Sequence, residues 1–552
     1  MIRNPILRGF YPDPSICRAG DDYYLVTSSF SYFPGIPVFH SRDLCRWEQI
    51  GHVLERAGQL HVTYRDISLG IFAPTIRWHD GVFYVITTNM TTHENFVCTA
   101  ENPAGPWSDP VVIAGAAGID PSLFFDDDGK VYFTGTAGSF GDMRYGHPVI
   151  ELREIDPHTM QFAGEGRAIG DGALKGAAAP EGPHLYKRNG WYYLMIAEGG
   201  TEHFHAVTVS RSRSLTEPFE NYAGNPILTH RHLGSLFPIC NVGHADMTEL
   251  SDGSWYMVCL GSRLVEGYHK PLGRETFLLP VAWEDDWPVA SPGTGKVERS
   301  YPAPACLVSG EEDVTAGAGR TMDETDDFTE EKLDLCWNYL GTPYEKFTRV
   351  ADSRLFIRMK AKSMIPTEYE GQKFDFFARI QDAGETKESV PFLGRRLTEP
   401  DFLAEAVMEA GLRETQSAGM MVLQNNANQL RLEAAACREQ AAFLTFRAVR
   451  VEYRLLEGGI QHYEETVCGS VDIPRAVSYM LKVKAKGLSY AFSVVSGDVE
   501  YMVAEGVDAS HLGSETAGGF VGAYIGMFAT GNGTAYEDEA AFDRFSLRVS
   551  VE

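Results

Sequence analysis

The chain has 552 residues, which is more than a single hydrophobic core supports, so we expect at least two domains. Hydrophobic residues make up 44% and charged residues 22%, an ordinary soluble composition, and no stretch approaches the roughly 20 apolar residues of a membrane span. The formal net charge of −27 repels nucleic acid and anionic membranes, and it suits a neutral ligand.

The start of the chain and its cysteines predict the compartment. Residues 1–10 contain no apolar run long enough for a signal peptide. The nine cysteines are scattered and odd in number, and none form a C-x-x-C pair, which argues against a disulfide framework or a zinc site. We therefore expect a cytoplasmic protein with reduced thiols.

A repeated unit runs through the first half of the chain. Each copy opens as a short strand, turns, and returns as an aromatic strand. The five copies begin at Asp13, Ala73, Asp120, Glu181 and Gly243, at separations of 60, 47, 61 and 62 residues. Their Gly-Asp, Asp-Gly or Asn-Gly turns supply the positive φ of tight β-hairpins. Because the spacing leaves room for two more strands per copy, the sequence predicts an all-β chain that begins with a five-bladed β-propeller.

The opening residues of the copies should meet at one end of the propeller axis, because the first strand of each blade lines that axis. These residues are Asp13, Ala73, Asp120, Glu181 and, one step into the fifth copy, His244. A single Asp-Pro or Pro-Glu is an ordinary loop dipeptide. Three carboxylates crowded together, by contrast, cost energy and mark function more often than not. The cluster is therefore a candidate active site.

The segments at these positions carry a resemblance. They are Tyr-Pro-Asp-Pro-Ser (11–15), Ala-Pro-Thr (73–75), Gly-Ile-Asp-Pro-Ser-Leu (118–123), Pro-Glu-Gly-Pro-His (180–184), Gly-His-Ala-Asp (243–246) and Leu-Gly-Arg-Glu-Thr (272–276). In this order they resemble the signature segments of glycoside hydrolase family 43, over residues 1–300.

The resemblance implies a role for each carboxylate. Asp13 corresponds to the general base that activates water, and Glu181 to the general acid that protonates the leaving oxygen. Asp120 corresponds to a third carboxylate that raises the pKa of Glu181 and orients it. The chemistry agrees with this division, because glycoside hydrolysis needs one protonated and one ionised carboxyl group on opposite sides of the bond. The resemblance also implies inversion of configuration.

The resemblance assigns further residues to the sugar and to a metal ion. Arg274 is expected to bind sugar hydroxyls, with a surface arginine paired to an acid as the alternative. Phe30 and Phe72 are expected to stack on the sugar, although a single aromatic is more often core and many relatives carry Trp where Phe72 stands. His244 is expected either to help hold a Ca²⁺ ion on the axis through waters or to be a hydrogen-bonded core histidine. No cofactor is expected to be required.

The second half of the chain predicts another β domain. We place the propeller at residues 1–290, a linker rich in small and acidic residues at 291–322, and a β-sandwich at 323–552. Period-two stretches argue for strands, with one short helix expected near 400–412. Three segments resemble the concanavalin A-like jelly roll of the family's β-xylosidases: Asp326-Asp327-Phe328, Pro-Phe-Leu-Gly-Arg-Arg (391–396) and Gly-Met-Met-Val-Leu-Gln-Asn (419–425).

An aromatic near the end of this domain is expected to close the catalytic pocket. In related xylosidases it comes from a glycine-rich segment, which here is Gly-Gly-Phe-Val-Gly-Ala-Tyr-Ile-Gly (518–526), and Tyr524 is the candidate. A closed end suits the release of single sugars from chain ends. The sandwich could instead serve only to brace the propeller.

These residues predict an exo-acting β-xylosidase, an α-L-arabinofuranosidase, or both, with xylo- or arabino-oligosaccharides as substrates. A fructan hydrolase would show Asn-Asp-Pro-Asn-Gly near the start and Glu-Cys at the acid, whereas this chain has Pro-Asp-Pro-Ser and Glu-Gly. A non-catalytic sugar-binding propeller would lack at least one carboxylate, and all three are present. The sequence leaves open the choice of sugar, the linkage, the need for a metal, and whether the chain forms a homo-oligomer.

Overall fold

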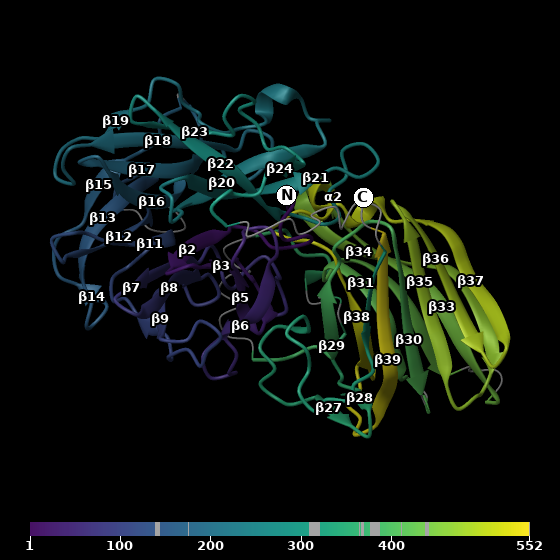
Figure 1. Ribbon diagram of the computed structural model, residues 1–552. Helices are drawn as coiled ribbons and strands as arrows, with labels where there is room; N and C mark the ends of the chain where they lie inside the picture. Colours follow the sequence, from purple (N-terminus) through teal and green to yellow (C-terminus); the bar gives the residue numbers. More distant parts are fainter. Residues whose placement is uncertain are drawn as a thin grey trace.

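The computed structural model describes residues 1–138, 144–174, 176–307, 321–363, 365, 369–375, 387–409, 411–413, 415–436 and 441–550. Two bodies of β-strands lie side by side, one built from the first half of the chain and one from the second (Figure 1). The all-β fold class predicted from the sequence is confirmed. Within the described residues, no helix is long and apolar enough to cross a membrane.

The first body contains five antiparallel sheets, one for each predicted repeat, and is the expected five-bladed propeller. Blade 1 is β2 (Ser15–Ala19), β3 (Asp22–Val26), β5 (Gly35–Ser41) and β6 (Glu48–Leu54). Blade 2 is β7 (Thr75–His79), β8 (Val82–Asn89), β9 (Glu94–Ala100) and β10 (Val111–Val112). Blade 3 is β11 (Ile119–Phe125), β12 (Val131–Ala137), β13 (Val149–Asp156) and β14 (Gln161–Phe162), with β15 (Arg167–Gly170) also paired to β13.

The last two blades follow the same order. Blade 4 is β16 (Glu181–Arg188), β17 (Trp191–Glu198), β18 (Ala206–Ser212) and β19 (Glu220–Asn221). Blade 5 is β20 (Ile239–Glu249), β21 (Trp255–Arg263), β22 (Glu275–Glu284) and β23 (Trp287–Ala290). Each inner strand contacts the next, from β2 through β7, β11 and β16 to β20 and back to β2, so the five close a ring around the axis.

The hairpin turns between the first two strands of each blade carry the predicted glycines. All five have positive φ, from 66° at Gly20 to 85° at Gly129. An L-residue adopts this conformation with difficulty, whereas glycine does so freely. The turn dipeptides therefore explain why the repeat could be found in the sequence.

The start of the chain closes the ring against blade 5. Strand β1 (Ile2–Arg3) pairs with β24 (Ser300–Tyr301), which follows the last blade. The Asn4 side chain donates a 2.8 Å hydrogen bond to the carbonyl of Leu278 on β22. Part of the expected linker, residues 308–320, lies outside the described residues.

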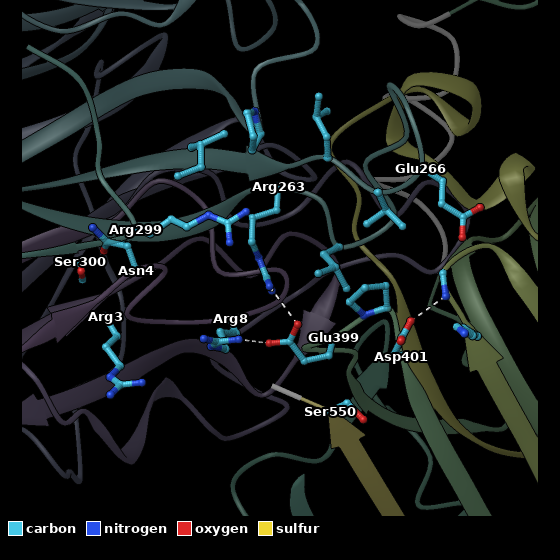
Figure 2. Close-up of a pocket in the computed structure, with 18 of the residues that line it drawn as sticks. Arg3, Asn4, Arg8, Arg263, Glu266, Arg299, Ser300, Glu399, Asp401 and Ser550 are labelled. Atoms are coloured by element: carbon cyan, nitrogen blue, oxygen red, sulfur yellow. Dashed lines mark hydrogen bonds and ion pairs between the residues drawn. The ribbon is translucent and has the colours of Figure 1, made fainter. Parts of the chain in front are cut away.

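A cavity of about 840 Å³ lies where the first residues of the chain, blade 5 and the second domain meet (Figure 2). Arg8 and Arg263 both form ion pairs with Glu399 there, with a distance of 2.9 Å from Arg263. Neither Asp13 nor any other candidate catalytic residue lines this cavity. Its polar groups join the two domains.

The second domain is a sandwich of two sheets. One is ordered β27 (Thr348–Ala351), β28 (Arg354–Arg358), β39 (Glu539–Ser550), β30 (Phe402–Glu409), β35 (Tyr479–Lys486), β36 (Ser489–Ser496) and β37 (Val499–Asp508), with β25 (Thr321–Asp326) also on β39. The other is ordered β34 (Ile460–Pro474), β33 (Phe443–Leu456), β32 (Asn428–Ala436), β31 (Ser417–Asn425), β38 (Tyr524–Thr530), β29 (Phe392–Arg396), β26 (Asn338–Leu340) and β4 (Tyr32–Phe33).

The prediction of a short helix near 400–412 is wrong. Residues 402–409 form strand β30, in which buried and half-buried side chains alternate. Leu, Ala, Glu and Met favour helices as single residues. Here the segment forms a strand because it pairs with β35 and β39 and buries every second side chain. The helical turns described in the structure are η1 (Arg231–Leu233), η3 (Glu457–Gly459), η4 (Ser510–Leu512) and α2 (Ser514–Ala517).

One strand of the sandwich comes from the propeller. Strand β4 lies in the connection between β3 and β5 of blade 1, and it pairs with β26 through Phe33–Tyr339 and Tyr32–Leu340. The two domains therefore share a sheet as well as an interface.

Candidate active site

The three predicted carboxylates stand at the same end of the five inner strands, but not all at equivalent positions. Asp13 and Asp120 both have φ of 54°, and each precedes a proline. In blades 4 and 5 the matching positive φ falls at Gly182 (57°) and His244 (46°). Glu181 therefore stands one residue before the position that the repeat assigned to it. Non-glycine residues in this conformation are strained, as is common at functional sites.

Asp13 is held by two donors. Ser28 Oγ donates to its Oδ2 at 2.6 Å, and Arg274 Nη1 lies 2.8 Å from its Oδ1. The Asp13 side chain is 7% exposed. Both carboxylate oxygens thus have fixed partners, one of them a guanidinium.

Arg274 binds Asp13, and one of its terminal nitrogens has no hydrogen-bond partner among the described residues. Besides Asp13, its Nη1 donates to Thr201 Oγ1 at 3.1 Å. Its Nη2 is buried and has no hydrogen-bond partner among the described residues. A buried donor without a partner is costly, so this nitrogen is suited to an oxygen of a bound ligand.

Glu181 and Asp120 resist ionisation. Burial, followed by the charge of Asp13, raises the pKa of Glu181 to about 7, against the opposing effect of Arg274. Burial, then the charges of Glu181 and Asp13, raise the pKa of Asp120 well above its usual range, although the backbone N–H of Gly182 donates to Asp120 Oδ2 at 3.2 Å. Asp13 is therefore the neighbour that most raises the pKa of Glu181. Asp120 and Glu181 titrate as an interacting pair.

Four phenylalanines gather beside Arg274. Phe30 stacks on Phe10 and on Phe520, each at 5.6 Å between ring centroids, and it packs against Phe72 at 5.4 Å. The Arg274 guanidinium lies 5.5 Å from the Phe30 ring and 5.2 Å from the Phe520 ring. Phe30 lies beside Arg274 and Phe72 beside Phe30, and these two residues are 2% and 5% exposed. Phe520 is the partly exposed member.

Tyr524, the residue expected to close the pocket, is not at the site. Its side chain is 0% exposed and stacks on Tyr32 with ring centroids 3.8 Å apart. The aromatic that the second domain brings to the site is Phe520, whose backbone N–H donates to Ser68 Oγ at 2.9 Å. Phe520 and Tyr524 belong to the same glycine-rich segment. Within it, Phe520 follows two glycines with positive φ in a loop, whereas Tyr524 begins strand β38 and faces the domain interface.

His244 is buried against the residue that follows Glu181. A Cβ at Gly182 would lie 2.9–3.2 Å from the imidazole of His244, so only glycine fits there. Among the described residues, no group of three or more His, Cys, Asp or Glu side chains is placed to hold a metal ion. The donor set around His244 therefore does not fit a cation held directly by protein side chains.

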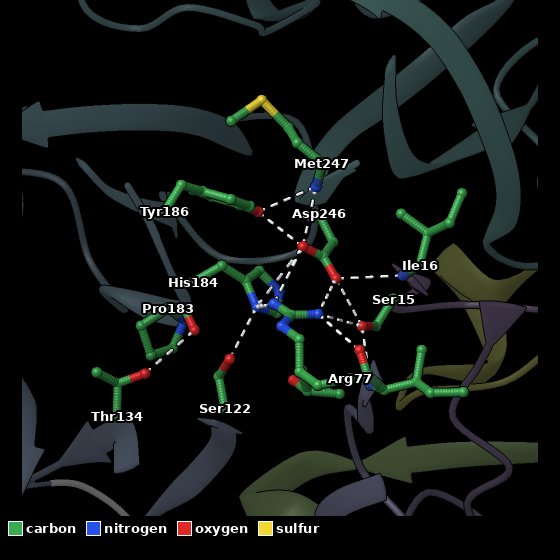
Figure 3. A network of polar contacts seen from close by, with 12 residues as sticks. Ser15, Ile16, Arg77, Ser122, Thr134, Pro183, His184, Tyr186, Asp246 and Met247 are labelled. Atoms are coloured by element: carbon green, nitrogen blue, oxygen red, sulfur yellow. Dashed lines mark hydrogen bonds and ion pairs between the residues drawn. The ribbon is translucent and has the colours of Figure 1, made fainter. Parts of the chain in front are cut away.

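A second layer of polar residues lies two positions further along the same strands (Figure 3). At its centre is Asp246, which is 0% exposed. Its two oxygens accept hydrogen bonds from Ser15 Oγ (2.6 Å), Ile16 N (3.2 Å), Tyr186 Oη (2.7 Å), Met247 N (2.9 Å), Arg77 Nη1 (2.8 Å) and Arg77 Nη2 (3.2 Å). Burial alone opposes ionisation, but the Arg77 charge and these donors hold the pKa of Asp246 well below its usual range.

Sequence reasoning missed Arg77, although a signal was present. The alternation of strand β7 places Ala73, Thr75 and Arg77 on the same side, toward the axis. A charged residue at an axis-facing position of an inner strand requires a partner there.

Comparison with known proteins gives one consistent result. Residues 2–288 match the family model "Glycosyl hydrolases family 43", and residues 325–548 match "Beta xylosidase C-terminal Concanavalin A-like domain". The chain is 40% identical to a xylosidase/arabinosidase of Butyrivibrio fibrisolvens, with 99% of each chain covered. It is 36% identical to a non-reducing end α-L-arabinofuranosidase of Bacteroides ovatus, over 99% of this chain and 94% of that protein.

Solved structures agree over the full length. The crystal structure of xylan β-1,4-xylosidase from Bacillus halodurans superposes with a TM-score of 0.84, at 29% identity and with 100% of both chains covered. A Bacteroides ovatus family 43 protein of a xyloglucan locus superposes with a TM-score of 0.82, at 35% identity and with 99% of both chains covered.

Proposed function

Because the chain belongs to glycosyl hydrolase family 43, we propose that it releases single terminal xylose or arabinose units from hemicellulose oligosaccharides by inverting hydrolysis. Family membership makes it a glycoside hydrolase with a carbohydrate substrate. The names of its relatives include a combined xylosidase/arabinosidase and an arabinofuranosidase, which supports both sugars as substrates.

The observation that carries the proposal is the unequal treatment of two neighbouring carboxyl groups. Asp13 is tied by Arg274 and Ser28, whereas the pKa of Glu181 is raised to about 7. Hydrolysis of a glycosidic bond requires one group of each kind. This supports Asp13 as general base and Glu181 as general acid.

In the proposed reaction, Glu181 gives its proton to the glycosidic oxygen as the bond to the anomeric carbon breaks. Asp13 takes a proton from the water that attacks the opposite face of that carbon, so the configuration inverts. Asp120 accepts the backbone N–H of Gly182, next to Glu181, and helps to orient the acid. The free Nη2 of Arg274 binds a sugar hydroxyl.

Release of single sugars is supported by the contribution of the second domain. Phe520 packs against Phe30 and Phe72, at 5.6 and 5.5 Å between ring centroids, and its ring lies 5.2 Å from the Arg274 guanidinium that binds Asp13. A site closed on one side accepts a chain end better than the middle of a chain.

The test is hydrolysis of 4-nitrophenyl β-D-xylopyranoside and 4-nitrophenyl α-L-arabinofuranoside, with proton NMR of the first product. We expect turnover of at least one substrate and an inverted anomer. A retained anomer would require a covalent intermediate and would rename Asp13 as the nucleophile. Binding of xylo-oligosaccharides without turnover of either substrate would favour a non-catalytic binding propeller.

A further inference from the structure

We propose that Arg77 is a built-in cation of the propeller axis, and that it positions the catalytic carboxylates where a divalent metal ion would otherwise be needed. The inference rests on the proposed roles of Asp13 and Glu181, and it concerns the layer beneath them. Arg77 contacts Ser15, His184 and Asp246, and none of these is a candidate catalytic or substrate-binding residue. We therefore treat Arg77 as a positioning residue.

The Arg77 guanidinium lies among axis-facing groups of the inner strands (Figure 3). Its Nη1 lies 2.8 Å from Asp246 Oδ2 and 3.3 Å from Ser15 Oγ. Its Nη2 lies 3.2 Å from Asp246 Oδ1 and 2.9 Å from His184 Nδ1. This is the forked geometry in which an arginine binds a carboxylate most firmly.

Arg77 contacts blades 1, 4 and 5 directly, and it reaches blade 3 through His184. Ser15 belongs to blade 1, Arg77 to blade 2, His184 to blade 4 and Asp246 to blade 5, and Ser122 of blade 3 hydrogen-bonds His184 Nδ1 at 3.1 Å. Because arginine only donates, His184 Nδ1 must accept, and burial lowers the pKa of His184 to about 3. The imidazole is therefore neutral, and Arg77 supplies the positive charge facing Asp246.

Each catalytic carboxylate is close in sequence to one of these contacts. Asp13 precedes Ser15 by two residues, Asp120 precedes Ser122 by two, and Glu181 precedes His184 by three. A proline lies between the two residues in each case, and the positive φ falls at Asp13, at Asp120 and at Gly182. A shift of the second layer is therefore passed to the carboxylates through short, stiff segments.

The charge balance leaves no role for a second cation in this layer. Asp246 is the fully buried carboxylate on the axis, and two nitrogens of Arg77 already face its oxygens. A metal ion added beside Asp246 would meet the Arg77 charge in a region of low dielectric. Removal of the guanidinium, in contrast, would leave Asp246 buried without a counter-charge and with space beside it.

The test compares wild type, Arg77→Ala, Arg77→Lys and a control, Arg431→Ala. Arg431 is buried and forms an ion pair with Glu465 at 2.6 Å, but it lies in the sandwich. For each protein we measure kcat and KM on the nitrophenyl substrate, and the thermal unfolding midpoint. Each measurement is made in EDTA, in Ca²⁺, and in methylguanidinium at a non-denaturing concentration.

For wild type we expect kcat and the unfolding midpoint to be unchanged between EDTA and Ca²⁺. Arg77→Ala should lower kcat by about 10²-fold with a smaller change in KM, because the carboxylates are displaced while the sugar-binding groups remain. Methylguanidinium or Ca²⁺ should restore part of kcat and raise the unfolding midpoint of this variant alone. The kcat of Arg77→Lys should lie between those of wild type and Arg77→Ala. Arg431→Ala should be less stable than wild type, and neither Ca²⁺ nor methylguanidinium should change its kcat or its unfolding midpoint.

Two results would overturn the proposal. One is a wild type that loses activity in EDTA and regains it with Ca²⁺. The other is a folded Arg77→Ala that keeps kcat within about twofold of wild type or responds to no cation. If Arg77→Ala does not fold, kcat and the unfolding midpoint of Arg77→Lys are compared with those of wild type instead. The activity of wild type on the nitrophenyl substrates tests the proposed function separately.

Discussion

Two layers on the propeller axis bury carboxylates in opposite ways. Around Asp246, six hydrogen-bond contacts converge, including both terminal nitrogens of Arg77, and the pKa falls well below its usual range. Two residues away along the same strands, Glu181 and Asp120 have raised pKa values. The layers share strands, and Asp246 is the more deeply buried carboxylate, so the difference lies in the Arg77 charge and in the donors that surround Asp246.

The comparison shows how the fold divides its tasks. A carboxylate whose acceptors are all satisfied holds the blades together and has no proton to give. A carboxyl group crowded by like charges stores unfavourable energy, which is what an acid working near neutral pH requires. Removing a carboxylate from the two layers should therefore change the free energy of unfolding in opposite directions and by different amounts.

The largest effect should come from the acid itself. Glu181→Gln should lower turnover of natural glycosides by about 10²–10⁴-fold, because no group then protonates the leaving oxygen. Activated substrates such as dinitrophenyl glycosides should lose much less. Steady-state kinetics on both kinds of substrate checks this, and an equal loss on both would remove Glu181 from the acid role.

In the second layer, Asp246→Asn should destabilise the protein by about 3 kcal/mol, because Arg77, whose side chain is 17% exposed, then loses its counter-charge. The folded pKa of Asp246 is depressed, so its stabilising contribution is present above the unfolded pKa and is lost as pH falls through the folded pKa. The difference between variant and wild type in urea unfolding should therefore be full at pH 7 and smaller in acid. Equal stability at pH 7 would contradict this view of the layer.

The same measurement should give the opposite sign for Glu181. Its folded pKa is raised to about 7, so the wild type loses stability as pH rises from the unfolded pKa to about 7, and the loss stays constant at higher pH. Glu181→Gln should be more stable than wild type at pH 8, by about 1–3 kcal/mol, and equal to it below the unfolded pKa. A variant less stable than wild type at pH 8 would show that Glu181 is not under electrostatic strain.

A smaller effect should follow from Asp120→Asn. The pH dependence of kcat/KM should be bell-shaped, with a basic limb near 7 that reports loss of the Glu181 proton. The ionised forms of Asp120 and Glu181 repel each other, so replacing Asp120 with a neutral Asn should let Glu181 ionise more easily and move this limb to lower pH, while burial and Asp13 keep it above the ordinary value for Glu. A limb that stays in place or moves up would remove Asp120 from the tuning of the acid.

The smallest effect should come from the second domain. Phe520→Ala should raise KM by about three- to tenfold with little change in kcat, because an aromatic contact beside the sugar is lost. Tyr524→Phe is the matched control, since the Tyr524 hydroxyl is buried and has no partner among the described residues. If Tyr524→Phe changes KM and Phe520→Ala does not, the two aromatics have been assigned in the wrong order.

The features that the sequence predicted are those with local signatures. A turn glycine recurs at each blade, and Asp-Pro or Glu-Gly opens three of the five copies, so the propeller and the cluster of three carboxylates could be found from the spacing of the repeat. The one-residue offset of Glu181 could not, because it depends on where the positive φ falls in blade 4. The repeat predicted the position of the acid only approximately.

The features that were missed depend on contacts between distant segments. Phe520 and Tyr524 lie in the same glycine-rich stretch, and only the docking of the two domains decides which reaches the carboxylates. The alternation in 402–409 was hidden by residues with high helix propensity, which the sheet overrides. Arg77 carried a signal as an isolated charge, but its partner Asp246 lies 169 residues away.

The sheet that β4 shares with the sandwich limits how this protein can be rearranged by recombination or engineering. Tyr32 and Phe33 pair with β26, and Phe30 beside the carboxylates stands two residues before Tyr32. If the second half were replaced by one from another protein, β4 would lose its partner strand β26, and Phe30 would lose its contact with Phe520. The two halves are contiguous along the chain, but they should be inherited, truncated or exchanged only as a pair. Libraries that seek new sugar specificity should therefore draw both halves from the same parent.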